Sequence, residues 1–406
     1  MKVLYLIDEW PIPTTTGAKV HDKIMMKCLL EDWAAEVSCW FEPERPESFP
    51  ALPDTNTLVR KRLSWSSIPL AILRLLLARV PLHTGEFLSS ESQTALRRIL
   101  SDANPQVIVL SSPRLAAIVP FIRRSCRARI IVDTHDVHVQ RCRSIIDALS
   151  PMQLGERIKQ LLLVRSYGII EKEIYKQVDV AWALKLEDKE LLDSFRSVAT
   201  VDIVPNVADP DMLPNLDAEL LAVEKDSTSC VFVGDYSYAP NEQCALIALD
   251  WFKDPRIMAL GVKLYLIGVN PTDAMLKAAQ GCRNVEITGK VPSLTEYYRP
   301  VDAIFLAPLL AGGGVKRKVI EAMVCGCPVI TTTVGAEGLD LSDGETALIR
   351  EVGDFAEAIL DLVGNRQRRI ELAFAGQDHI NLHFGFDKLR GLVRASIKAL
   401  NERAPL

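Results

Sequence analysis

Three consecutive glycines lead into a basic segment with a single carboxylate, AGGGVKRKVIE at residues 311–321. The N-terminus of a helix presents unpaired N–H groups and a partial positive charge, and glycine lets an anion approach the backbone closely. Lys316 and Lys318 add two full positive charges. We therefore predict a diphosphate site, with a tight turn before a solvated basic helix as the competing interpretation. The residues predicted to surround the anion are Gly312, Gly313, Gly314, Val315, Lys316 and Lys318.

Glu321 admits two interpretations. In a helix that begins near Val315, it lies about two turns from the start, on the same face as Arg317 and Lys318. It either forms an ion pair within the helix or binds the two hydroxyls of a ribose, as acidic groups do in other nucleotide sites. The stretch contains neither GxxxxGKS/T nor GxGxxG, so it is neither a P-loop nor a dinucleotide fingerprint.

Polar side chains also end the apolar run RIIVDTHD at residues 129–136. If this run is a buried parallel strand, His135 and Asp136 lie at its carboxyl edge, where ligands of open α/β sheets bind. We predict that both are catalytic, with His135 acting as a general acid or base or as a hydrogen-bond donor to a sugar. Asp133 and His138 are near in sequence, but their spacing matches no established ligand set, so no metal site is predicted.

These residues require strands that end beside them, and the sequence predicts such strands in both halves of the chain. Short runs that are apolar throughout alternate with helical segments, which is typical of buried parallel strands in a doubly wound α/β sheet. The expected strands are 2–7, 35–41, 105–112, 129–136, 178–184 and 201–206 in the first half, and 229–235, 263–269, 285–291, 303–309, 328–333 and 347–350 in the second.

Residues 208–228 separate the two series and are rich in Asp and Pro, as in a linker. We predict an α/β protein with two Rossmann-like domains facing a cleft, a favoured place for a ligand. The N-terminal domain is expected at 1–205 and the C-terminal domain at 206–378, with a helix at about 379–406 packing back on the first. Gly17 precedes the helix-like AKVHDKIMMKCLLED and would bring a second helix N-terminus to the cleft.

Composition narrows the range of partners. The 406 residues are 49% hydrophobic and 24% charged, as in an ordinary globular protein. The net charge of -5 argues against nucleic acid as a partner. Nine cysteines without paired spacing, and a strand-like run directly after Met1, predict a cytoplasmic protein with free thiols.

Residues 55–85 form a basic and apolar window that contains no Asp or Glu. Its run IPLAILRLLLARV is interrupted by Arg74 and Arg79 and is too short to span a bilayer. The window is either a core helix with solvated arginines or a peripheral contact with the inner face of an anionic membrane.

Several segments resemble GT-B glycosyltransferases of retaining family 4, in that family's order along the chain. The most specific is APLLAGGGVKRKVIEAMVCGCPVITTTVGAEGL at 307–339, and others are VFVGDYSYAPNEQCAL at 231–246, VDIVPNV at 201–207 and THD at 134–136. The resemblance implies a hexosyltransferase-type enzyme of polysaccharide, glycolipid or glycoconjugate biosynthesis. A UDP-sugar or GDP-sugar donor would bind the second domain, a carbohydrate or lipid-linked acceptor would bind the first, and transfer would proceed with retention and without a further cofactor.

Position by position, the resemblance gives roles to residues in both domains. Glu321 is similar to the glutamate that holds the ribose, Gly17 to the glycine beside the diphosphate, and His135 to the histidine near the reacting end of the sugar. The strand ends implied to contact the nucleotide contribute Gly234, Thr288, Gly289 and Val291.

The sequence departs from the family pattern in two places. The first glutamate of the E-x7-E motif falls at Gly313, and the arginine and lysine that neutralise the diphosphate fall at Asp235 and Asn241. We infer that Lys316 and Lys318 supply the missing charge. Cations at a helix start also stabilise a departing diphosphate, so we expect no essential divalent cation.

Two alternatives to a transferase remain. One is a nucleotide-sugar epimerase of the same fold, which would turn over the donor without an acceptor. The other is an inactive nucleotide-sugar-binding protein, since a fold does not establish a function.

Overall fold

A computed structural model of the chain describes residues 1–11, 17–41, 56–59, 67–148, 154–212, 228–310 and 315–402. The chain divides into two compact units. The N-terminal unit comprises Met1–Pro205 with Leu389–Leu406, and the C-terminal unit comprises Asn206–Lys388. The division falls at the boundary expected from the sequence.

The N-terminal unit contains a parallel sheet with seven described strands, in the order β3-β2-β1-β4-β5-β6-β7. β1 and β4 are buried at every residue, as expected for parallel strands that helices cover on both faces. The strand order reverses between β1 and β4, so the carboxyl ends there form a switch point where ligands bind in such sheets. The strands are β1 (Val3–Ile7), β2 (Glu36–Phe41), β3 (Asn56–Val59), β4 (Val107–Leu110), β5 (Arg129–Asp133), β6 (Val180–Ala183) and β7 (Val201–Ile203).

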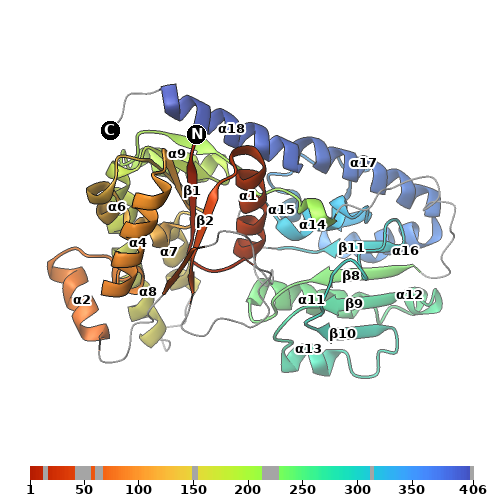
Figure 1. Ribbon diagram of the computed structural model, residues 1–406. Helices are drawn as coiled ribbons and strands as arrows, with labels where there is room; N and C mark the ends of the chain where they lie inside the picture. Colours follow the sequence, from red (N-terminus) through yellow and green to blue (C-terminus); the bar gives the residue numbers. More distant parts are fainter. Residues whose placement is uncertain are drawn as a thin grey trace. The chain divides into compact units, whose positions relative to one another are not determined.

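Helices flank this sheet, with α1 and α4 on opposite sides of β1 and β2 in Figure 1. α4 illustrates their local determinants. Its N-cap Ser89 accepts a hydrogen bond from the N–H of Ser92, Leu96 and Leu100 are buried one turn apart, and Asn104 ends the helix in the left-handed conformation. The helices are α1 (Gly17–Trp33), α2 (Ile68–Leu77), α3 (Thr84–Phe87), α4 (Ser90–Ala103), α5 (Pro113–Ala116), α6 (Val119–Ser125), α7 (His138–Ala148), α8 (Leu154–Lys172), η1 (Ile174–Gln177) and α9 (Leu186–Ser194).

The C-terminal unit contains a second parallel sheet, with six described strands in the order β10-β9-β8-β11-β12-β13. Figure 1 shows β11, β8, β9 and β10 in this sequence. The sheet reverses its order between β8 and β11, which places another switch point at their carboxyl ends. The strands are β8 (Ser229–Val233), β9 (Lys263–Ile267), β10 (Val285–Gly289), β11 (Ala303–Ala307), β12 (Val329–Thr331) and β13 (Leu348–Ile349).

Helices of the C-terminal unit bury one face against this sheet. In α14, Val319, Ile320 and Met323 are buried while the basic first turn is not, because the apolar residues recur at helical spacing. The helices are η2 (Pro210–Met212), α11 (Ala239–Trp251), α12 (Pro255–Ala259), α13 (Asp273–Ala278), α14 (Arg317–Val324), α15 (Thr333–Ala336), η3 (Val352–Asp354), α16 (Phe355–Gly364) and α17 (Arg366–Phe384). The last helix, α18 (Phe386–Glu402), belongs to the N-terminal unit from Leu389 onward.

The end of the chain returns to the N-terminal unit through α18. Arg390 donates to Asp32 of α1, and Trp182 of β6 donates its Nε1–H to Ser396 Oγ at 2.9 Å. The returning segment begins at Leu389, ten residues later than the predicted start near 379, because α17 belongs to the C-terminal unit.

The strands expected from apolar runs are all present, each within a few residues of its expected bounds. The sequence missed β3, whose four residues NTLV include two polar ones and give no apolar run. A strand this short is formed by pairing with β2 rather than by its own hydrophobic pattern.

The basic and apolar window is only partly described, because residues 60–66 lie outside the described part of the chain. The described part contains α2, and its side chains are mostly exposed, with Leu75 fully buried. The interpretation of this segment as a core helix is therefore wrong. Within the described ranges, no helix is long and apolar enough to cross a membrane.

Candidate functional site

Glycines occupy the carboxyl ends of three neighbouring strands of the C-terminal sheet. Gly234 directly follows β8, Gly268 follows β9, and Gly289 ends β10. The N–H of Gly234 donates to Ile267 at 3.0 Å, and the N–H of Gly268 donates to Gly289 at 3.0 Å. The predicted residue Gly234 therefore lies at a backbone edge of the kind that approaches ligands in α/β sheets.

Gly234 and Gly268 lie so close together that a side chain on Gly268 would have no space. Gly268 has a φ of +146°, and a Cβ atom on it would lie 1.7 Å from the carbonyl oxygen of Gly234. Only glycine adopts this conformation without strain. The strand ends are thus held close together by the absence of side chains.

Lys318 of α14 extends to this edge. Its Nζ lies 2.7 Å from Oδ1 of Asn241 on α11 and 4.5 Å from the centre of the Phe232 ring on β8. Asn241 in turn donates its Nδ2–H to the carbonyl oxygen of Asp235, at 2.9 Å. An ammonium group from α14 therefore lies beside position 241, where the family pattern carries its own lysine.

Burial lowers the pKa of Lys318 to about 8. About ten ammonium groups are then present for each neutral amine at pH 7. The Asn241 oxygen and the Phe232 ring face both stabilise this charge, the second through a cation–π contact. The site holds a partly desolvated positive charge, and a bound anion would compensate it.

Asp235 also departs from the family pattern, and its carboxylate is bound locally. Oδ1 accepts hydrogen bonds from Ser237 and from Asn270 Nδ2, the latter at 3.0 Å. The hydrogen bond from Asn270, followed by those from Ser237, lowers the pKa of Asp235. Position 235, which carries a cation in the family pattern, thus carries a carboxylate here, and Lys318 supplies a positive charge from α14 instead.

The first helical residues after the glycine run differ slightly from the prediction. α14 begins at Arg317 with Lys316 as its N-cap, two residues later than the expected start at Val315. Lys316 Nζ lies 3.3 Å from Glu337 Oε2, directed to a different partner from Lys318. The predicted anion-binding residues Gly312, Gly313 and Gly314 lie outside the described part of the chain.

Glu321 lies one turn into α14 rather than two, as a consequence of the later start. Arg317 donates its Nε–H to Glu321 Oε1 at 2.9 Å, so the ion pair within the helix is present. Burial raises the pKa of Glu321, and Arg317 opposes that shift. The binding of a ribose by Glu321 stays a prediction.

The residues expected to contact a base lie at the end of β10. Thr288 and Val291 are half-buried, and Gly289 between them has a φ of +68°. The left-handed conformation at Gly289 turns the chain at the strand end and suits glycine. The contact with a base stays a prediction.

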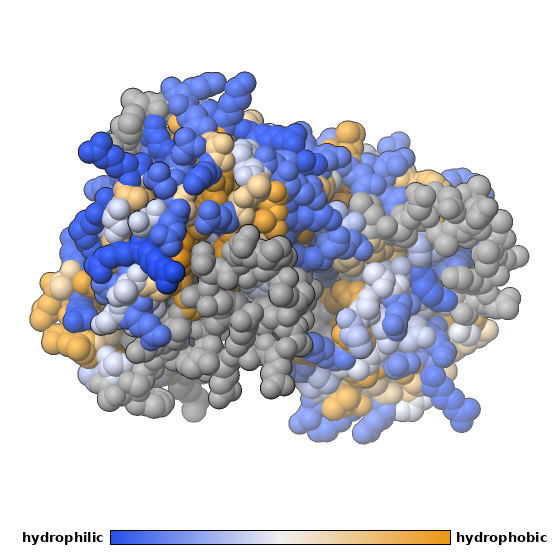
Figure 2. Space-filling view, in the orientation of Figure 1, coloured by the Kyte–Doolittle hydropathy of each residue, from blue (hydrophilic) through white to orange (hydrophobic). Residues whose placement is uncertain are grey.

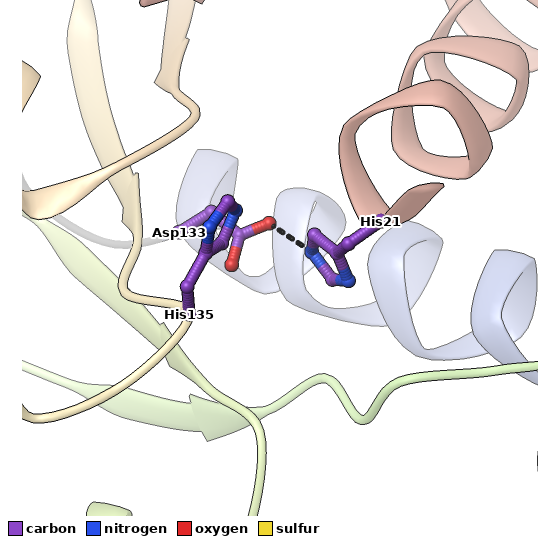
Figure 3. A group of neighbouring side chains, drawn as sticks. All are labelled: His21, Asp133 and His135. Carbon is purple, nitrogen blue, oxygen red and sulfur yellow. Dashed lines mark hydrogen bonds and ion pairs between the residues drawn. The ribbon is translucent and has the colours of Figure 1, made fainter. Parts of the chain in front are cut away.

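In the N-terminal unit, the predicted residue His135 belongs to a buried cluster with His21 and Asp133 (Figure 3). His21 lies one turn into α1, Asp133 ends β5, and His135 follows in the loop. His21 Nε2 and Asp133 Oδ2 are 2.7 Å apart, and the two imidazole rings are 4.8 Å apart in an edge-to-face arrangement. The cluster joins the N-terminal end of α1, which begins at Gly17, to the carboxyl end of β5.

A second carboxylate, Asp22, faces His135. The distance from Asp22 Oδ1 to His135 Nε2 is 3.3 Å, and Tyr5 donates its hydroxyl to the same oxygen at 3.2 Å. Burial lowers the pKa of His135, but the carboxylates of Asp22, Asp133 and Asp8 together outweigh burial and raise the pKa to about 9. Burial acts to raise the pKa of Asp133, but His21 and His135 together outweigh burial, so the pKa of this carboxyl group is lowered. His135 is therefore a protonated hydrogen-bond donor at neutral pH.

The backbone of His135 is unusual for a residue with a side chain. Its φ is +50°, and the neighbouring Asp136 N–H donates to the carbonyl oxygen of Thr134. Non-glycine residues in the left-handed region are uncommon and occur often at functional sites, where the surroundings hold them. Here the tight turn directs the imidazole toward α1.

The arrangement also resembles a set of metal ligands. The ligand atoms of His21, Asp133 and His135 all lie within 4.8 Å of one another. A metal ion requires an unprotonated imidazole nitrogen, and Nε2 of each ring faces a carboxylate here. The absence of a metal site stays a prediction.

Asp136, the second predicted catalytic residue, lies outside this cluster. Its carbonyl oxygen accepts from His138 Nδ1 at 3.1 Å, and burial raises the pKa of its carboxyl group. Burial lowers the pKa of His138 to about 3, so His138 is neutral. The sequence missed His21, Asp22 and Tyr5. The adjacent His and Asp one turn after Gly17 were the available signal.

Comparison with known proteins identifies a similar family in the C-terminal unit. Residues 227–365 match the family model of glycosyl transferases group 1. The D-inositol 3-phosphate glycosyltransferase of Paenarthrobacter aurescens (strain TC1) is 26% identical over 110 residues, which are 26% of this chain and 26% of that protein. The C-terminal unit is therefore similar, over residues 227–365, to glycosyl transferases group 1.

Solved structures extend the similarity to the whole chain. The sucrose-phosphate synthase of Thermosynechococcus elongatus has a TM-score of 0.68 at 16% identity and covers 100% of both chains. HepE of Anabaena in complex with UDP-glucose has a TM-score of 0.64 at 12% identity, covering 98% of this chain and 100% of that one. The trehalose-phosphate synthase of Burkholderia vietnamiensis has a TM-score of 0.60 at 12% identity, covering 98% and 97%.

Identities this low show a shared fold. The two units with parallel sheets have the GT-B fold, as the sequence predicted. Residues 227–365 are thus similar to glycosyl transferases group 1, and the chain as a whole has the fold of GT-B glycosyltransferases.

Proposed function

We propose that the protein transfers a sugar from a nucleotide-diphospho-sugar to a hydroxyl group of a saccharide or lipid-linked acceptor, with retention of anomeric configuration. The donor binds the C-terminal unit, where the group 1 domain lies. The transfer requires no divalent cation. The assignment to retaining family 4 is part of this proposal.

The observation that carries the proposal is the position of Lys318. Its ammonium group lies 2.7 Å from Asn241, at the glycine-lined strand ends of the group 1 domain. The cation missing at position 241 is thus supplied from α14, and it is partly desolvated. A desolvated, fixed cation stabilises a diphosphate more strongly than a solvated one does.

The chemical step develops charge that this site is suited to stabilise. The bond between the anomeric carbon and the phosphate oxygen breaks, and the acceptor oxygen forms the new bond to that carbon. The acceptor proton passes to the departing phosphate oxygen, and the nucleoside diphosphate leaves. Lys318 stabilises the negative charge on the leaving group, and Lys316 adds to the positive potential of the helix start.

His135 has a defined task in this scheme. Because its pKa is raised to about 9, it is already protonated at neutral pH and cannot accept the acceptor proton. We assign it the role of a hydrogen-bond donor to a sugar, with Asp22 holding the charge. Asp136 remains a candidate for a polar contact with substrate.

The preferred donor is a UDP-sugar. The support is that HepE, which shares the fold, was solved with UDP and with UDP-glucose. We expect UDP to raise the unfolding temperature of this protein more than GDP does, because a ligand that binds only the native state stabilises it by mass action. A larger shift with GDP would reverse the choice of base and leave the diphosphate site unaffected.

The transfer itself is tested by following UDP release with a panel of UDP-sugars and acceptors. Proton NMR of the first-formed product should show the anomeric configuration of the donor, and activity should persist in EDTA. An inverted product would refute the retaining mechanism, and loss of activity in EDTA restored by magnesium would refute metal independence.

The same assay separates the two alternatives. Turnover of UDP-sugar to its epimer without an acceptor would identify an epimerase. Tight UDP binding without turnover across the panel would identify an inactive binding protein.

A further inference from the structure

The apolar side chains of α2 are exposed to an unusual degree. Leu70, Leu73, Leu76 and Leu77 are between 47% and 76% exposed, whereas Leu75 is buried. Figure 2 shows hydrophobic side chains gathered over this helix. Single exposed leucines are common on protein surfaces, but a contiguous group of them marks an interaction surface.

A second exposed row lies on α8. Leu154, Ile158 and Leu161 follow one another at helical spacing and are between 51% and 63% exposed. α2 contacts α8, and Arg165 of α8 donates to the carbonyl oxygen of Leu76 at 3.2 Å. Leu161 lies one turn before Arg165, so the two apolar rows adjoin. We call these seven residues the α2–α8 face.

The charges on α2 are positive. Residues 67–85 contain no Asp or Glu. Arg74 is exposed on α2 itself, and Arg79 follows the helix and forms a surface ion pair with Glu173 at 2.7 Å. The apolar side chains of α2 are therefore flanked by cations.

α8 adds further positive charge beside its apolar row. Its exposed half carries Arg157, Lys159 and Arg165 against one acid, Glu156. Glu156 is bound to Lys159 at 3.1 Å. Exposed leucines beside an excess of arginine and lysine fit a partner that has an apolar interior and an anionic surface.

We propose that the α2–α8 face docks on the surface of an anionic lipid bilayer. The leucines enter the boundary between headgroups and acyl chains, and Arg74 and the cations of α8 contact lipid phosphates. This surface lies in the N-terminal unit, and its binding does not depend on the donor chemistry of the C-terminal unit.

A second copy of the chain is a poorer occupant. In a two-fold dimer the same patch meets itself, so Arg74 and its neighbours would face the same cations of the other copy. Like charges brought together in a partly desolvated interface repel each other, whereas lipid phosphates attract them. The charge pattern therefore favours the membrane.

Vesicle flotation of the full chain tests the proposal. We expect binding to vesicles of phosphatidylcholine with phosphatidylglycerol to exceed binding to phosphatidylcholine alone by about tenfold or more. The variant Leu73→Ser/Leu77→Ser should bind the anionic vesicles about tenfold more weakly. Arg74→Gln should lose about fivefold, the equivalent of one basic residue near the surface.

The matched control is Leu276→Ser/Leu382→Ser, which removes two exposed leucines of the C-terminal unit and should bind as the wild type does. UDP binding without vesicles, measured on every variant, reports separately on folding and on the donor site. Absence of flotation by the wild type would overturn the proposal, as would equal losses in the control. A dimer in sedimentation velocity that Leu73→Ser/Leu77→Ser dissociates would assign the face to a second copy.

Discussion

Replacement of Lys318 by methionine tests the central assignment of the donor site. Methionine keeps the apolar stem over Phe232 and removes the charge 2.7 Å from Asn241. A hydrogen bond to a charged group contributes about 1.5–3 kcal/mol. The affinity for UDP, measured by titration calorimetry, should therefore fall about 10- to 150-fold.

Stability should respond differently from affinity. Removing the buried charge relieves its desolvation, and this gain offsets the lost hydrogen bond and cation–π contact. We expect the free energy of unfolding of Lys318→Met to stay within about 1 kcal/mol of the wild type. A loss of affinity without a loss of stability would separate a binding role from a structural one.

A charge exchange makes the test specific. In the double variant Lys318→Met/Asn241→Lys, the lysine is moved from α14 to the position that carries it in the family pattern. Most of the lost UDP affinity should return. Unchanged UDP affinity in Lys318→Met would refute the reasoning, and so would a loss of affinity that the lysine at position 241 does not restore.

The pH dependence of UDP affinity provides an independent check. The pKa of Lys318 in the folded protein, about 8, lies below that of an ordinary lysine. Below pH 8 the ammonium group therefore carries its charge at the cost of desolvation, and above pH 8 the group loses its proton and its charge. UDP affinity should fall as the pH rises through 8. This fall should be absent in Lys318→Met.

Three further predictions concern the remaining residues. Asp22→Asn should lower the pKa of His135 from about 9 toward its ordinary value, as measured by NMR of the imidazole. The free energy of unfolding of the wild type should fall as the pH rises through 9, because the ion pair is then lost, and the variant should lack that fall. Glu321→Gln should weaken UDP binding about tenfold and reduce its preference over 2′-deoxy-UDP. Gly268→Ala should lower the free energy of unfolding by more than about 3 kcal/mol, whereas Gly261→Ala, with φ of +66° but open space, should cost about 1 kcal/mol.

Each of these has a result that contradicts it. Asp250→Asn, an exposed aspartate in the other unit, is the control for Asp22, and an equal effect of both on His135 would exclude a direct ion pair. If Glu321→Gln binds UDP and its deoxy analogue in the wild-type ratio, Glu321 serves only its ion pair with Arg317. Equal stability of the two glycine variants would mean that the strand ends can separate.

The sequence alone was sufficient for most of the scaffold. Parallel strands that helices cover are largely apolar, so twelve strands could be recognised from short apolar runs. β3 was missed because its pairing with β2 forms it. The exposed α2 was ambiguous for a related reason, since an apolar helix has the same sequence in a core and on a surface.

For the sites, too, the sequence predicted some features and the structure was needed for others. The sequence identified Lys318, Glu321 and His135 as candidates, because a motif fixes residue type and spacing. It could not identify the Lys318–Asn241 contact, which joins residues 77 apart in the sequence and brings α14 to α11. Nor could it pair His135 with Asp22, since that contact requires β5 and α1 to meet.

Sequence by itself thus determined the fold class, the division into two units and the residue types available for an anion site. Tertiary structure decided which charges are desolvated and which partner holds each one. The physical reason is that hydrophobic patterning is local along the chain, whereas burial and electrostatic pairing depend on segments that are distant in sequence and close in space.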